Sequence, residues 1–164
     1  MTTDHPNRDA ATAPTLYYWH LWTDAHGVSH QSRCVLDRFQ QQSMSGAAPQ
    51  WNDVQEASRA TVVFSVLPVG WVGDWHENPK PQWIVPLSGR WYVQSMDGQR
   101  VELGVGEVSF GGDQHCRNDA HGHKGHRSGT IGDEPAVLML VQLDGPNPPG
   151  RPPNALDDAG GHRD

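Results

Sequence analysis

Short runs of apolar residues recur along the middle of the chain, and groups of polar and turn-forming residues separate them. The runs are rich in β-branched and aromatic residues, as β-strands are. Turn sequences such as Asp97-Gly98 lie between them. The pattern predicts about eight strands and no amphipathic helix. The expected strands lie at 16–22, in a run that reaches Val35 and Phe39, and at 61–67, 83–87, 90–95, 100–103, 107–110 and 137–143.

These strands predict an all-β fold, and their positions predict the boundaries of its domain. Eight strands are the number that a double-sheeted jelly roll uses. The aromatic run at 16–22 and the turn after it predict an N-terminal hairpin, and polar residues 40–58 predict a loop with at most a short helical turn. One domain is expected at 14–143, with the hairpin and loop extension at 14–58 and the barrel core at 59–143. Residues 1–13 and 144–164 are expected to be disordered tails.

Composition narrows the classes of partner. The chain has 164 residues and a net charge of -7, without a basic cluster, so nucleic acid is not an expected partner. No signal sequence and no run of roughly 18 apolar residues is present, which predicts a cytoplasmic protein without a membrane span. Cys34 and Cys116 are far apart and form no metal-binding or redox spacing, so both are expected to be free thiols.

Polar residues with metal-binding chemistry gather between two glycines, Gly70 and Gly89. His76 and Asn78 are two positions apart, so on a strand they share one face. Gln82 opens the next expected strand and reaches the same cavity if the two strands are antiparallel neighbours. The spacing therefore predicts one polar pocket at these three side chains.

The segment Gly70-x5-His76-x-Asn78-x3-Gln82-x6-Gly89 resembles the first motif of the cupin family. Asn78 stands where that motif has its second His, and Gln82 where it has Glu. Gly104-Val105-Gly106-Glu107 resembles the turn that opens the second motif, and His126 its closing His, with an inserted loop between them. The resemblance covers residues 70–143 and implies a double-stranded β-helix, the jelly-roll cupin barrel.

The resemblance also implies a metal centre. Carried over position by position, the ligands are His76, Gln82 and His126, with Asn78 as a ligand or a hydrogen-bonding neighbour. The implied cofactor is a divalent transition metal: Fe, Mn, Ni, Cu or Zn. The alternative for the two histidines is that both are buried imidazoles satisfied by hydrogen bonds.

Two functions follow from this resemblance. The first is a metal-dependent enzyme for a small organic substrate, either a dioxygenase or a Lewis-acid lyase or isomerase. His121 or His123 of the inserted loop would transfer protons, and Arg90 or Arg127 would neutralise a substrate carboxylate. The second is a non-catalytic small-molecule-binding protein with a vestigial metal site. His121 and His123 are also explained as residues of a solvated loop.

A homodimer is a further expectation from the resemblance, because cupin barrels tend to pair through sheet edges and N-terminal strands. The aromatic hairpin that begins at 16–22 would then lie at the dimer interface. The alternative is that this hairpin covers its own barrel.

Overall fold

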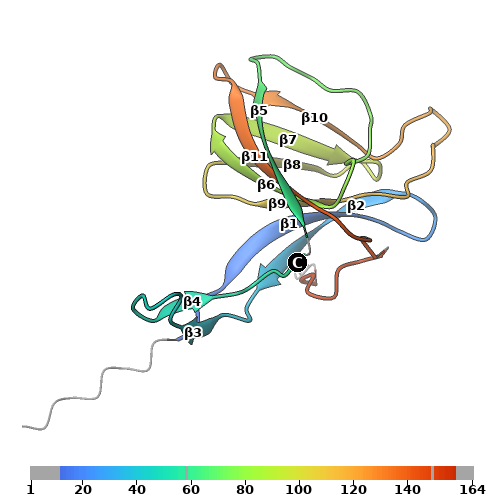
Figure 1. Cartoon of the computed structure of the whole chain (residues 1–164). Coiled ribbons are helices and arrows are strands. Elements are labelled where there is room, and N and C mark those ends of the chain that lie inside the picture. Colours follow the sequence, from blue (N-terminus) through green and yellow to red (C-terminus); the bar gives the residue numbers. More distant parts are fainter. Residues whose placement is uncertain (1–11, 58, 149, 158–164) are drawn as a thin grey trace, which may run out of the picture.

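This computed structural model describes residues 12–57, 59–148 and 150–157. These residues contain eleven β-strands and no helix (Figure 1). An all-β fold is thereby confirmed. No helix of the described residues is long and apolar enough to cross a membrane. The strands are β1 (Leu16–Thr23), β2 (Ser29–Leu36), β3 (Gln40–Gln42), β4 (Gln50–Asn52), β5 (Ala60–Leu67), β6 (Gln82–Ser88), β7 (Arg90–Ser95), β8 (Arg100–Gly104), β9 (Ser109–Gly112), β10 (His126–Ile131) and β11 (Ala136–Leu143).

The strands form two facing sheets and one small hairpin. The larger sheet has the order β2-β1-β9-β6-β11-β5, and the smaller has the order β10-β7-β8. β1 and β9 are parallel, whereas the other pairs in these sheets are antiparallel. β3 and β4 pair with each other. The last strand, β11, lies between β5 and β6 and joins them into one sheet (Figure 1).

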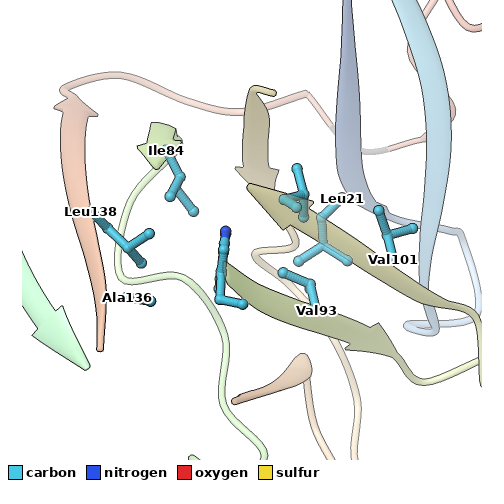
Figure 2. Close-up of a cluster of buried hydrophobic side chains, with 8 residues drawn as sticks. Leu21, Ile84, Val93, Val101, Ala136 and Leu138 are labelled. Atoms are coloured by element: carbon cyan, nitrogen blue, oxygen red, sulfur yellow. The ribbon is translucent and has the colours of Figure 1, made fainter. Parts of the chain in front are cut away.

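Alternation along the strands places one apolar set between the two sheets. Ile84 and Leu138 belong to the larger sheet, and Val93 and Val101 to the smaller. All four are at most 7% exposed and belong to one buried cluster. Figure 2 shows them directed toward a common interior. The core therefore lies between the sheets, and both sheets contribute to it.

Several predicted elements are present and others differ. The N-terminal hairpin is confirmed as β1 and β2, in full antiparallel register. The segment 40–58 holds a short hairpin, β3–β4, instead of a loop with a helical turn. β10 was not among the predicted strands, yet it pairs with β7 over six positions.

Part of the expected C-terminal tail lies against the larger sheet. Ala155 forms a bridge with Cys34 of β2, and the Leu156 amide donates to the Arg33 carbonyl at 2.8 Å. The Asn154 side chain donates to the Val35 carbonyl at 2.9 Å. Residues 154–156 thus satisfy backbone groups on the outer edge of β2, which explains why this part of the segment is not a free tail. Within the expected tails, residues 1–11, 149 and 158–164 lie outside the described residues.

Candidate functional site

A cavity of about 120 Å³ lies between the two sheets. Its walls come from β5, β6, β7, β10 and β11 and from the connection between β5 and β6. Four lining side chains carry an imidazole or an amide group, and apolar side chains form the rest of the wall. The lining residues are Ser65, Leu67, Trp71, His76, Asn78, Gln82, Ile84, Trp91, His126, Ser128, Leu138 and Leu140.

Strand alternation explains the polar wall of this cavity. His126 and Ser128 of β10 lie two positions apart and are both buried, whereas Arg127 between them is exposed. Gln82 and Ile84 of β6 repeat the pattern. The inner positions at one end of the sheets are therefore polar, where the core would otherwise continue.

The backbones of His76 and His126 are direct antiparallel partners. Each amide donates to the other's carbonyl, at 2.9 and 2.8 Å, and the two ring centroids are 4.5 Å apart. Gly125 precedes His126 with a φ of 82° and lies so close to the His76 carbonyl that a Cβ would collide with it. A glycine at 125 therefore lets the two histidine segments approach.

Hydrogen bonds define the orientation of both imidazoles. His76 Nδ1 lies 2.8 Å from the Asp74 carbonyl, and His126 Nδ1 lies 2.7 Å from Asp113 Oδ2. Because a carbonyl and an ionised carboxylate only accept, Nδ1 carries the proton in each neutral ring. The Nε2 atoms then keep their lone pairs, and neither has a hydrogen-bond partner among residues 12–57, 59–148 and 150–157.

Asp113 is fully buried and holds His126 in place. Burial by itself raises the pKa of a carboxyl group, but the interactions with His126 and the Asn78 donors outweigh burial and lower the pKa of Asp113. The Asn78 backbone amide and side-chain amide both donate to Asp113 Oδ1, at 3.0 and 2.6 Å. Asp113 is therefore ionised, and its negative charge lies beside Nδ1 of the His126 ring.

Three buried or half-buried amides extend this network away from the histidine. Gln142 Nε2 donates to Gln82 Oε1 at 3.1 Å, and Gln82 Nε2 donates to Asn78 Oδ1 at 2.6 Å. Asn78 then donates to Asp113. One chain of hydrogen bonds with a single direction thus runs from β11 across β6 to the carboxylate.

The fit of these residues to a metal ion is incomplete. Two imidazole Nε2 lone pairs are available, which suits a transition metal. The Gln82 and Asn78 oxygens already accept hydrogen bonds, and Asp113 binds His126 instead of facing the cavity as a ligand. No group of three or more His, Cys, Asp or Glu side chains with metal-binding geometry exists in the described part of the chain. This donor set does not fit a tightly held ion.

The structure places the predicted catalytic residues outside the cavity lining. His121 is exposed, and His123 stacks on Trp75 and lies 3.1 Å from Asp119. Arg90 is exposed, with its guanidinium 3.8 Å from Glu102. His123 and Arg90 thus interact with neighbouring side chains and not with the cavity. Arg127, the other predicted carboxylate partner, is exposed as well.

Two site residues were not found from the sequence. Asp113 follows β9 directly, and a carboxylate at the end of a strand is the sequence signal that could identify it. Trp91 lies on a predicted strand, where the local pattern does not distinguish a tryptophan that fills the core from one that lines a cavity. It is 3% exposed and lines the cavity, as does Trp71. Trp83 lies on the opposite face of β6 and packs against Phe110.

A larger hollow of about 370 Å³ lies elsewhere, between the β2 end and residues 153–154. Its lining includes Asp37 and Arg38 but no histidine or cysteine. Volume alone does not define a reactive site, so the smaller cavity with the two imidazoles is the stronger candidate.

Comparisons with known proteins add little to this description. No protein-family model matches the chain, and no curated protein matches it. Among solved structures, the protein NMB1881 from Neisseria meningitidis matches at 16% sequence identity, over 56% of this chain and 89% of that one, with a TM-score of 0.38. A likeness this weak supports no conclusion about fold family or activity.

Proposed function

We propose that the chain is a cupin-type jelly-roll protein whose cavity binds a small organic molecule and transfers a proton to or from it, as an isomerase or lyase does. The observation that carries this proposal is the buried His126–Asp113 pair at 2.7 Å, whose free Nε2 belongs to a residue of the cavity wall. The two-sheet arrangement and the motif spacing support the cupin assignment.

In this proposal His126 is the general base and then the acid. Asp113 orients the ring, fixes the Nδ1–H tautomer and stabilises the imidazolium that forms when Nε2 takes a proton. The amides of Asn78 and Gln82 keep Asp113 in position. His76 Nε2, on the neighbouring ring, is a second acceptor for a substrate hydroxyl.

The test uses cyclopentanone, a small ketone with exchangeable α-hydrogens, in D₂O. We expect the protein to accelerate α-deuteration, measured by proton NMR, above the rate given by an equal concentration of free imidazole. His126→Gln is expected to lower this rate about a hundredfold or to background, because general-base catalysis contributes at least about that factor. His26→Gln is the matched control, since His26 is exposed on the β1–β2 turn. Equal rates for wild type and His126→Gln would contradict the proposal.

Adding cyclopentanone in the same NMR experiment also distinguishes the proposed enzyme from the alternative predicted from the sequence, a non-catalytic binding protein. Saturable binding of cyclopentanone in NMR without any deuteration would favour it. The apolar half of the cavity wall, which includes Ile84, Leu138 and Leu140, supports binding in either case.

The metal-dependent enzyme remains a prediction from the sequence. The specific observation in its favour is that both Nδ1 atoms are engaged by oxygen acceptors, which is the usual arrangement of metal-binding histidines. Elemental analysis of untagged protein tests it. Stoichiometric metal that disappears in both His76→Ala and His126→Ala would establish the metal centre and replace the metal-free proposal.

A further inference from the structure

The indole N–H of Trp91 is a buried donor without an acceptor. Trp91 Nε1 has no hydrogen-bond partner among the described residues, and the side chain is 3% exposed. An unsatisfied buried donor costs about 1–3 kcal/mol, so folded proteins rarely leave one without a partner. Trp91 lines the same cavity as His76 and His126. We therefore place the missing acceptor in this cavity.

The size and charge of the cavity limit what that acceptor belongs to. The cavity of about 120 Å³ is somewhat smaller than the cavity of about 150 Å³ that holds benzene in another protein. Its lining contains no Lys or Arg, so nothing compensates the desolvation of a carboxylate or phosphate. The cavity suits a small neutral molecule with one acceptor oxygen.

We propose that the ligand is a small neutral carbonyl compound, with its oxygen bound to Trp91 Nε1–H and its α-carbon beside His126. This rests on the proposed function. When His126 Nε2 takes the α-proton, the C–H electron pair forms a C=C bond and the carbonyl π pair moves to oxygen. The Trp91 N–H then stabilises the developing enolate oxygen, where one donor is worth most. Return of a proton to the α-carbon regenerates the ketone with that hydrogen exchanged, whereas its return to another carbon of a conjugated enolate gives the isomer.

The binding test compares three probes with equal numbers of non-hydrogen atoms: cyclopentanone, methylenecyclopentane, which lacks the oxygen, and isobutyrate, which is charged. We expect the ketone to bind about fivefold to tenfold more tightly than the alkene, because one hydrogen bond contributes about that factor. Isobutyrate is expected to bind more weakly than both. The Trp91 indole proton should shift in NMR with the ketone alone.

Trp91→Phe keeps an aromatic ring but removes the donor, and it should abolish the preference for the ketone. Trp83→Phe is the matched control on the outer face of β6 and should keep the preference. Equal affinity of wild type for ketone and alkene would overturn the Trp91 proposal while leaving binding and proton transfer at His126 intact. Deuteration lost only in His126→Gln, with the ketone preference unchanged in Trp91→Phe, would overturn it as well.

A separate observation concerns the outer face of the larger sheet at β5. Val62, Phe64 and Val66 are 54%, 66% and 63% exposed and lie on one side of this edge strand. Val141, Met139 and Val137 of β11 are their cross-strand partners on the same side. We call these six residues the β5 face. Several hundred Å² of contiguous apolar surface is typical of an interaction site.

The two edges of the larger sheet differ. β2 is covered by residues 154–156, whereas β5 has β11 as its strand partner and no further one in the described residues. Exposed edges are normally protected by charges, prolines or bulges. β5 has none of these within Ala60–Leu67.

We infer that the β5 face binds the β5 face of a second copy of this chain, across a two-fold axis. β5, β6 and β11 contain no charged residue, whereas the whole chain carries a charge of -7. Two copies therefore repel over most of their surfaces and approach at least cost here. An interface of standard size buries about 800 Å² per partner, over half of it apolar, and the six side chains of the β5 face would form its core.

Sedimentation equilibrium at tens of micromolar tests this. We expect wild type at twice the chain mass of 18.1 kDa and Val66→Glu at the chain mass. Val105→Glu introduces the same charge at a residue that is 68% exposed in the β8–β9 turn, and it should remain dimeric. A monomeric wild type, or a dimer that survives Val66→Glu, would overturn the inference.

Discussion

Asp113 accepts three hydrogen bonds from Asn78 and His126 although it is fully buried. Asp113→Asn replaces one accepting oxygen with a donor that faces other donors. We expect a loss of about 2–4 kcal/mol in the free energy of unfolding, measured by urea titration. Asp133→Asn, at an exposed position, should change it by less than about 0.5 kcal/mol. An unchanged urea midpoint for Asp113→Asn would show that the carboxylate is not the centre of the network.

His20 lies on the outer side of β1, against Phe110 at 4.8 Å between ring centroids. Burial lowers its pKa from 6.5 to about 4, and its Nδ1 has no partner in the described part of the chain. Below pH 6.5 the unfolded chain binds a proton at this position that the folded chain does not. Stability therefore falls as the pH drops from about 6.5 toward 4.

Between pH 7 and pH 5 this effect amounts to about 2 kcal/mol. We expect His20→Leu to lose that much less stability than wild type over the same interval, measured by urea titration at both pH values. His26→Gln, at an exposed histidine, should keep the wild-type dependence. Parallel curves for His20→Leu and wild type would contradict the buried neutral imidazole.

At the scale of residues, the motif spacing correctly predicted which side chains lie close together, but it did not predict their hydrogen-bond partners. His76, Asn78, Gln82 and His126 do line one cavity. What the spacing did not reveal is that the Gln82 amide is engaged at both ends, because one partner, Gln142, is 60 residues away. Long-range partners of a side chain are set by sheet topology, which the local pattern does not contain.

Residues 154–156 lie along β2 and form an antiparallel bridge with it at Ala155. The Asn154 side chain connects this segment to the sheet, since it donates hydrogen bonds to the Tyr18 hydroxyl and the Val35 carbonyl, both at 2.9 Å. We expect Asn154→Ala to lower the free energy of unfolding by about 1–2 kcal/mol. It should also speed hydrogen exchange at the Val35 and Leu156 amides, measured by NMR.

Asn52→Ala is a useful comparison, since Asn52 donates only to carbonyls of its own short hairpin. It should leave exchange at Val35 and Leu156 unchanged. If Asn154→Ala also leaves these amides protected, the segment is not held by that side chain.

β10 shows why one element escaped prediction. His126 and Ser128 are polar and line the cavity, so the inner face of this strand lacks an apolar stripe. Hydrophobic patterning finds strands through the core that they bury. A strand whose inner face serves a site gives no such signal, whereas β7 and β11, which place Val93 and Leu138 in the core, do.

For the whole molecule, the all-β class followed from the short runs and turn residues, because glycine-rich turns and β-branched runs exclude a helical bundle. The arrangement into six and three strands did not follow. β1 pairs with β9 in parallel, and β5 reaches β6 only through β11. Pairings between distant segments leave no trace in the local sequence pattern.

The central place of β11 has a consequence for how the protein is made. β11 ends at Leu143, so β5 and β6 leave the ribosome well before the strand that joins them. Ala136 and Leu138, which complete the core, arrive with it. Until then the apolar faces of β5 and β6 lack their common neighbour. This chain therefore completes its larger sheet only after residue 143 has been synthesised, and until then it exposes apolar surface that the finished sheet buries.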